Sequence, residues 1–240
     1  MNISQFDSNL EKAETQKQAE ALLREYLTQF GFRSYAFTYY SGHIKTGRKL
    51  IYHYASKALR PWHVHYLEQG YADIDRVLEN ISKTTLPVYW TVQAQLLNPK
   101  NKRERTMREE ALAFGLDHGL SVSTYGTHND FVSLTLHQRV GETCLKHYKT
   151  MQYKWLSATC VFYHHIKRIL NLNSTPINLY KLTRRETQCL LLTAKSWRVE
   201  KIAKELKISA RTVNFHIQNA NKKLGTNNKY QAAFEHFQIL

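Results

Sequence analysis

Near the C-terminus, four polar side chains have the types and the spacing that recognition of duplex DNA requires. Arg211, Asn214, Gln218 and Lys222 recur every three or four residues, so they share one face of a helix. Arginine can bond guanine at two points, asparagine and glutamine can do the same with adenine, and lysine can meet a phosphate. The predicted DNA contacts on this segment are Ser209, Arg211, Thr212, Asn214, Phe215, Gln218 and Lys222.

The opposite face of the same segment is apolar. Val213, Ile217, Ala220 and Leu224 form one stripe, which would pack inward and leave the polar face outside. Ser209 is a good N-cap for this helix. Any amphipathic helix shows polar residues outward, so this feature alone does not establish a DNA-binding surface.

Two more predicted helices precede that segment. Thr183 and Glu186 have the spacing of a capping box, in which each side chain bonds the other residue's backbone N–H. After a break near Ser196, a short helix carries Val199 and Ile202 on one face, and a tight turn at 207–208 follows. Residues 182–240 are therefore predicted to form an all-α helix-turn-helix domain.

The charge distribution supports this location. The chain has 34 Lys and Arg against 19 Asp and Glu, a formal net charge of +15. Residues 182–240 hold 11 basic and 4 acidic residues, and residues 1–181 hold 23 and 15. The charge density is about threefold higher at the C-terminal end, which favours a polyanionic partner there. Double-stranded DNA is the first candidate and an anionic membrane the second.

Upstream, the pattern is that of an α+β domain. Helices are predicted at 4–29, 60–82, 103–117 and from Glu142, and strands at 34–40, 49–54, 120–126 and 131–137. This order predicts an antiparallel sheet flanked by helices, an α/β/α sandwich. Asn, Ser, Thr and Pro near 171–181 favour turns. The predicted domains are 1–171 and 182–240, joined by a linker at 172–181.

The N-terminal domain contains a group of aromatic residues whose spacing is suggestive. Trp62 and Tyr66 share a helical face, Tyr71 follows, and Trp90 ends a predicted strand. Aromatic pairs at helical spacing belong to a hydrophobic core more often than to a binding site. The residues alone therefore favour a core.

The C-terminal domain resembles the DNA-binding domain of LuxR-type regulators over nearly its whole length. Its segments LTRRE, KIAKEL and SARTVNFH match that family's LTxRE, EIA and TVxxH pattern. Ser196 stands where the family usually has glycine. If that position has a positive φ, serine there is strained.

The spacing W-x3-Y-x8-D, with a second tryptophan fifteen residues on, is similar to the autoinducer-binding domain of the same family of quorum-sensing regulators. The resemblance implies that Asp75 accepts the amide N–H of an acyl-homoserine lactone. It implies that the Tyr66 hydroxyl bonds the amide carbonyl and the Trp90 indole the lactone carbonyl. Trp62 would wall the lactone ring. The predicted ligand-binding residues are Trp62, Tyr66, Tyr71, Asp75, Trp90 and Ser133.

Two positions depart from that family pattern. Ala58 replaces a tyrosine, which removes a hydrogen-bond donor, and Arg76 replaces a proline and can pair with Asp75. A related signal, or none, therefore stays open beside an acyl-homoserine lactone. The alternative is a ligand-independent or differently regulated helix-turn-helix transcription factor whose N-terminal domain only dimerises.

Further expectations concern partners and location. Helix-turn-helix proteins commonly bind two half-sites about 34 Å apart, so a homodimer on an inverted-repeat operator is predicted, with RNA polymerase as a further candidate partner. No apolar run approaches the roughly 20 residues that span a bilayer, which predicts a cytoplasmic protein without membrane contact.

Motif searches favour a protein that is not an enzyme. The chain has no GxSxG, HExxH or Gly-rich phosphate loop. No cofactor or metal site is predicted, because Cys144, Cys160 and Cys189 lack metal-ligand spacing and the paired histidines are not four residues apart. The cysteines are expected to be reduced and buried.

Overall fold

The computed structural model describes residues 1–41, 49–127, 130–139, 141–142, 145, 148–172, 182–230 and 232–233. Cys144 and nearly all of the predicted linker lie outside these residues. The sequence pattern also predicts a last helix at 229–239, and most of that segment lies outside them as well. Two compact units have their main bodies in residues 1–170 and 171–240, and each is described by itself. Of the part described, no helix has both the length and the apolar character needed to cross a bilayer.

The larger unit contains a five-stranded sheet in its described residues, in the order β2-β1-β5-β4-β3. The strands are β1 (Ser34–Ser41), β2 (Lys49–Ala55), β3 (Val88–Thr91), β4 (Leu116–Tyr125) and β5 (Phe131–Arg139). The β1–β5, β5–β4 and β4–β3 pairs are antiparallel. The predicted α+β class with an antiparallel sheet is confirmed.

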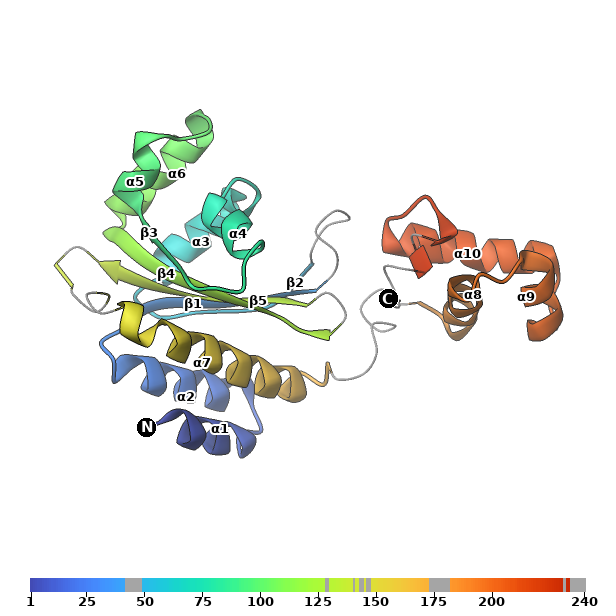
Figure 1. Ribbon diagram of the computed structural model, residues 1–240, viewed down its shortest axis with the longest axis horizontal. Coiled ribbons are helices and arrows are strands. Elements are labelled where there is room, and N and C mark those ends of the chain that lie inside the picture. Colours follow the sequence, from blue (N-terminus) through green and yellow to red (C-terminus); the bar gives the residue numbers. More distant parts are fainter. Residues whose placement is uncertain are drawn as a thin grey trace. The chain divides into compact units, whose positions relative to one another are not determined.

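Helices cover both faces of this sheet (Figure 1). Helices α1 (Ile3–Glu11), α2 (Gln16–Thr28) and α7 (Tyr148–Ile169) lie on one face. On the other lie α3 (Arg60–Glu68), a 3-10 turn η1 (Tyr71–Asp73), α4 (Arg76–Ile81), α5 (Val92–Leu97) and α6 (Lys102–Ala113). The unit is the predicted α/β/α sandwich.

Strand alternation separates a dry core from the candidate site. On β1, Phe37 packs edge-on against Phe162 of α7, with 4.7 Å between ring centres. The alternate residues Ala36 and Thr38 point to the opposite face, where they line a cavity. On β5, Ser133 and its alternate neighbours line the same cavity. One face of the sheet thus packs against α7, and the other face lines the cavity.

Several predicted element boundaries differ from the structure. The helix expected at 4–29 is two helices, because Thr15 forms a capping box with Gln18 and starts a new one. The helix expected at 103–117 ends at Ala113, since Gly115 adopts φ +80° and strand β4 begins at Leu116. The helix expected from Glu142 is described from Tyr148. Helix α5 was not predicted.

The smaller unit is the predicted all-α domain. Its described helices are α8 (Arg184–Ala194), α9 (Val199–Leu206) and α10 (Ala210–Leu224). Val213 and Ile217 of α10 pack against Cys189 of α8 and Ile202 of α9. The apolar stripe predicted for the third helix is therefore buried, which fixes its polar face on the outside.

Capping interactions set the ends of these helices. Thr183 and Glu186 form the predicted capping box, and Glu186 also accepts a bond from Lys223 at 2.8 Å. Burial opposes ionisation of Glu186, but the Lys223 ammonium and Thr183 hold its pKa below the usual value. Ser196 has φ +59° between α8 and α9, the left-handed conformation expected at the family's glycine.

Candidate functional site

The candidate ligand site is a cavity of about 80 Å³ between the sheet and helices α3 and α4. Trp62, Tyr66 and Ser133, three of the predicted ligand residues, line it. The other lining residues are Ala36, Thr38, Tyr40, His63, Val77, Leu78, Ile81, Thr135 and His137. The wall is thus mostly apolar on the helices, with polar side chains along β5.

Asp75 is the polar centre beside this cavity, because its carboxylate bonds Tyr66 and Val77, which both line the cavity. Its carboxylate accepts hydrogen bonds from the Tyr66 hydroxyl at 3.1 Å and from the Arg108 guanidinium at 2.6 Å. It also accepts from the Val77 N–H at 2.9 Å and thereby caps α4. Burial, together with the Asp75 charge, holds the pKa of Tyr66 well above its usual value, so this hydroxyl keeps its proton.

The expectation that Arg76 pairs with Asp75 is wrong. Arg76 instead bonds Glu104, whose side chain is 1% exposed, and the backbone carbonyl of Gln95 at 3.3 Å. The partner of Asp75 is Arg108 from α6, and the Arg108 side chain is 5% exposed. Two ion pairs, each with one buried member on α6, therefore join the start of α4 to α6. Removal of one member of such a pair leaves a buried charge uncompensated.

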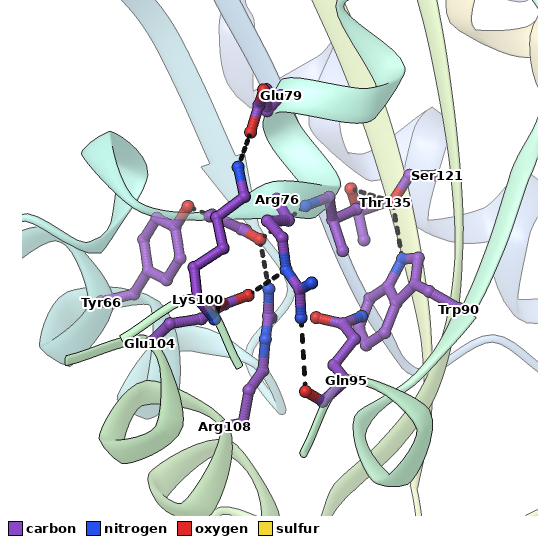
Figure 2. Close-up of polar contacts among 12 residues, drawn as sticks. Tyr66, Arg76, Glu79, Trp90, Gln95, Lys100, Glu104, Arg108, Ser121 and Thr135 are labelled. Atoms are coloured by element: carbon purple, nitrogen blue, oxygen red, sulfur yellow. Dashed lines mark hydrogen bonds and ion pairs between the residues drawn. The ribbon is translucent and has the colours of Figure 1, made fainter. Parts of the chain in front are cut away.

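Trp90 lies on β3 with its indole N–H already bonded. The N–H donates to the Ser121 hydroxyl at 3.0 Å, and Ser121 and Thr135 share a further bond of 3.0 Å (Figure 2). The ring lies directly over Gly119, where an added Cβ would come within 2.0 Å of it. This close approach explains why glycine is needed at position 119.

Tyr71 contacts Trp62 and Tyr66 but is not among the residues that line this cavity. Its ring packs behind Trp62, with centres 6.3 Å apart, and its hydroxyl donates to Glu110 at 2.6 Å. Burial, with the Glu110 bond, raises the pKa of Tyr71 to about 12. Its position is that of a support for the Trp62 ring.

Three residues of this site were missed by sequence reasoning. His137 follows Ser133 by four positions on β5, so strand alternation could have placed it on the same face. His63 is adjacent to Trp62, but a helix does not bring adjacent residues to one face. Arg108 lies 33 residues from Asp75, and no local pattern indicates their contact.

The second candidate site is the outer face of α10. Arg211, Asn214, Gln218 and Lys222 are all exposed, as is Phe215, whose side chain is 57% accessible. Ser209 and Thr212 serve the helix start, because the Ser209 hydroxyl accepts the Thr212 N–H at 3.0 Å and shares a bond of 2.7 Å with its hydroxyl. The polar face that is predicted to contact DNA is therefore exposed within its unit.

No group of three His, Cys, Asp or Glu residues within the described ranges could hold a metal ion. The expectation that the cysteines are buried is wrong for Cys160, which is exposed on α7, whereas Cys189 is buried.

Two known protein families match separate parts of the chain. The family "Autoinducer binding domain" matches residues 15–157, and "Bacterial regulatory proteins, luxR family" matches residues 180–235. The chain belongs to the LuxR family of transcription regulators. The family is one of regulators, as predicted, and not of enzymes.

Individual relatives agree with this assignment. The transcriptional activator AnoR of Acinetobacter nosocomialis is 32% identical over 177 residues, which are 72% of this chain and 71% of AnoR. Escherichia coli SdiA matches with a TM-score of 0.73 at 20% identity over 97% and 94% of the two chains. A structure of SdiA in complex with octanoyl-rac-glycerol matches with a TM-score of 0.72 at 21% sequence identity and covers 97% of this chain and 92% of SdiA. CepR2 of Burkholderia cenocepacia is described as N-acylhomoserine lactone dependent. It matches with a TM-score of 0.55 at 16% sequence identity and covers 70% of this chain and 96% of CepR2.

Proposed function

We propose that this LuxR-family regulator binds a neutral acylated signal in the cavity between the sheet and α3–α4 and reads an operator with α10. The signal is an acyl-homoserine lactone or a related small amide. The observation that carries the proposal is the pairing of Asp75 with Tyr66, whose ring lines the cavity. A carboxylate that accepts and a hydroxyl that donates are the two groups needed to hold an amide. The single Tyr66 proton would then turn from Asp75 to the amide carbonyl.

Asp75 retains the capacity for this role although it already has partners. Each carboxylate oxygen carries two lone pairs, and Oδ2 is bonded only by Tyr66 among the contacts described above. An amide N–H can therefore add to Asp75 while Arg108 holds the other oxygen. Trp62 and Ser133 line the same space. A bond from Trp90 to a lactone carbonyl would require its indole to leave Ser121.

The volume of the cavity sets a condition on binding. At about 80 Å³ it is smaller than the roughly 300 to 1,000 Å³ of typical small-molecule sites. A signal can therefore enter only if lining side chains move. Support for an acylated signal comes from the relatives, since CepR2 is described as N-acylhomoserine lactone dependent and SdiA is known with octanoyl-rac-glycerol.

The regulator is proposed to act in the cytoplasm as a homodimer on an inverted repeat, with RNA polymerase as a further partner. Two copies of a helix-turn-helix domain reach half-sites about 34 Å apart on one face of the duplex. The basic excess of residues 182–240 favours association with that polyanion.

The test of the ligand site is the substitution Asp75→Asn. Asparagine keeps the shape and still caps α4, but it loses the charge and half of the acceptor capacity. Octanoyl-homoserine lactone should raise the melting temperature of the wild-type chain, and Asp75→Asn should abolish this rise. Asp73→Asn, an exposed position two residues earlier, is the matched control and should respond like the wild type.

A second variant guards against a folding defect. Tyr66→Phe removes one hydroxyl without leaving a buried charge and should weaken the ligand-induced rise while circular dichroism stays native. If Asp75→Asn and Tyr66→Phe both keep the full response, the ligand does not use this site. If no acylated amide stabilises the wild-type chain, the result supports the alternative, in which the N-terminal domain only dimerises. The Asp75–Arg108 pair and the small cavity favour that alternative.

A further inference from the structure

Two imidazoles line the same cavity from different elements. His63 comes from α3 and His137 from β5. His137 is only 8% exposed. The Nε2 atom of His63 and the Nδ1 atom of His137 are buried and have no hydrogen-bond partner in the part of the chain that the structure describes. Buried polar atoms are nearly always paired in folded proteins, so two such atoms at one cavity need an explanation.

Both histidines are neutral at physiological pH. Burial lowers the pKa of His137 to about 4 and that of His63 to about 3, because the charged form is poorly solvated there. A neutral imidazole has one N–H donor and one acceptor nitrogen. Such a pair cannot neutralise a carboxylate or a phosphate. It matches an uncharged oxygen, either a carbonyl that accepts or a hydroxyl that accepts and donates.

The two imidazoles also lie near the proposed amide anchor. The charges of Asp75 and Arg108 both influence the His137 ring, and His137 in turn influences His63. The Trp90 ring packs edge-on against His137, with centres 5.4 Å apart. The His63 ring stacks on His53 at 3.7 Å. These ring contacts hold both imidazoles in place at the cavity.

We propose that His137 and His63 form a polar subsite for an uncharged carbonyl or hydroxyl oxygen that lies next to the amide of the signal. This inference rests on the proposed function and adds a specificity determinant to it. The oxygen can belong to the acyl chain or to the ring of the head group, and both sources present the same chemistry. Signals without that oxygen would leave the imidazole nitrogens unpaired, which costs affinity.

The experiment compares four compounds of equal chain length by thermal shift and calorimetric titration of the full chain. They are octanoyl-, 3-oxooctanoyl- and 3-hydroxyoctanoyl-homoserine lactone, and N-cyclopentyl octanamide, which lacks the lactone oxygens. The variants are His137→Phe and His63→Phe, which keep a ring but remove the nitrogens. His164→Phe, on the exposed side of α7, is the control.

The wild type should bind the compound with the matching oxygen about 10-fold more tightly than the one without it, the factor of one buried hydrogen bond. Preference for a 3-oxygen over octanoyl-homoserine lactone assigns the acyl chain, and preference for the lactone over the cyclopentyl amide assigns the ring. Each histidine variant should lose that preference, and His164→Phe should keep it.

Two results would overturn the inference, and they are distinguishable. If the compounds bind but both histidine variants keep the wild-type order of affinities, the subsite is wrong and the proposed function stands. If none of the four compounds binds the wild type, the proposed function fails and the subsite fails with it. The two variants lie on different elements, so a folding defect in one leaves the other as a test.

Discussion

At the scale of single residues, the buried histidines make the stability of the larger unit depend on pH. The folded-state pKa values of His137 and His63, about 4 and about 3, lie below the ordinary value for histidine, roughly 6.5. Below that ordinary value the unfolded chain binds protons that the folded chain does not. The contribution of the two neutral histidines to stability is therefore complete above about pH 6.5, and it is lost as the pH falls toward their folded-state pKa values.

Urea denaturation at pH 7 and pH 5 measures this effect. We expect the free energy of unfolding of the wild type to fall by on the order of 4 kcal/mol more than that of a double variant His63→Phe, His137→Phe, about half from each histidine. His164→Phe should follow the wild type, because that side chain is exposed. Equal pH dependence in the double variant and the wild type would mean that these imidazoles are protonated in the folded state.

At the scale of elements, the turn between α8 and α9 carries strain. Ser196 adopts φ +59°, a conformation that glycine accepts and other L-residues resist. Ser196→Gly should raise the free energy of unfolding of the C-terminal unit by about 1 kcal/mol, measured by urea denaturation. Ser157→Gly, in the middle of α7, should instead lower stability, because glycine weakens a helix interior. A destabilising Ser196→Gly would contradict the strain.

Helix α10 supports a prediction about sequence recognition. Gln218 is exposed beside Asn214 on the face opposite the buried Ile217. Gln218→Ala should weaken binding to a duplex selected from a random pool by about 1 to 3 kcal/mol, with little effect on an unrelated duplex. Lys222→Ala, at a predicted phosphate contact, should weaken both. Equal losses for both duplexes in Gln218→Ala, measured by fluorescence anisotropy, would exclude direct base reading by this side chain.

At the scale of the whole molecule, the proposed homodimer predicts a dependence on half-site spacing. Insertion of 5 base pairs between two half-sites rotates one by half a turn, and insertion of 10 restores the face. Affinity should fall at least about 10-fold for the first duplex and recover partly for the second. Sedimentation with and without octanoyl-homoserine lactone gives the mass of the particle in solution, which distinguishes a monomer from a dimer. A monomer that binds all three duplexes equally would contradict the dimer.

Much of the fold follows from local sequence alone. The capping box at Thr183 and the stripe through Val213 and Ile217 predicted the helices of the C-terminal unit, because caps and periodicity act within a few residues. Local enrichment in aromatic and β-branched residues likewise predicted β1 and β5. The same local information failed at Thr15 and Gly115, where a cap and a positive φ ended an otherwise continuous helical pattern.

The site shows which part the sequence determined and which part only the tertiary structure decided. Resemblance to the W-x3-Y-x8-D pattern of the LuxR family pointed to Trp62, Tyr66 and Asp75, since all three lie within one short motif. The pairing of Asp75 with Arg108 instead of Arg76, and the meeting of His63 with His137, were not predictable from spacing. These partners lie on separate helices and strands, so sheet register and helix packing determine their contacts, and neither is a local property of the chain.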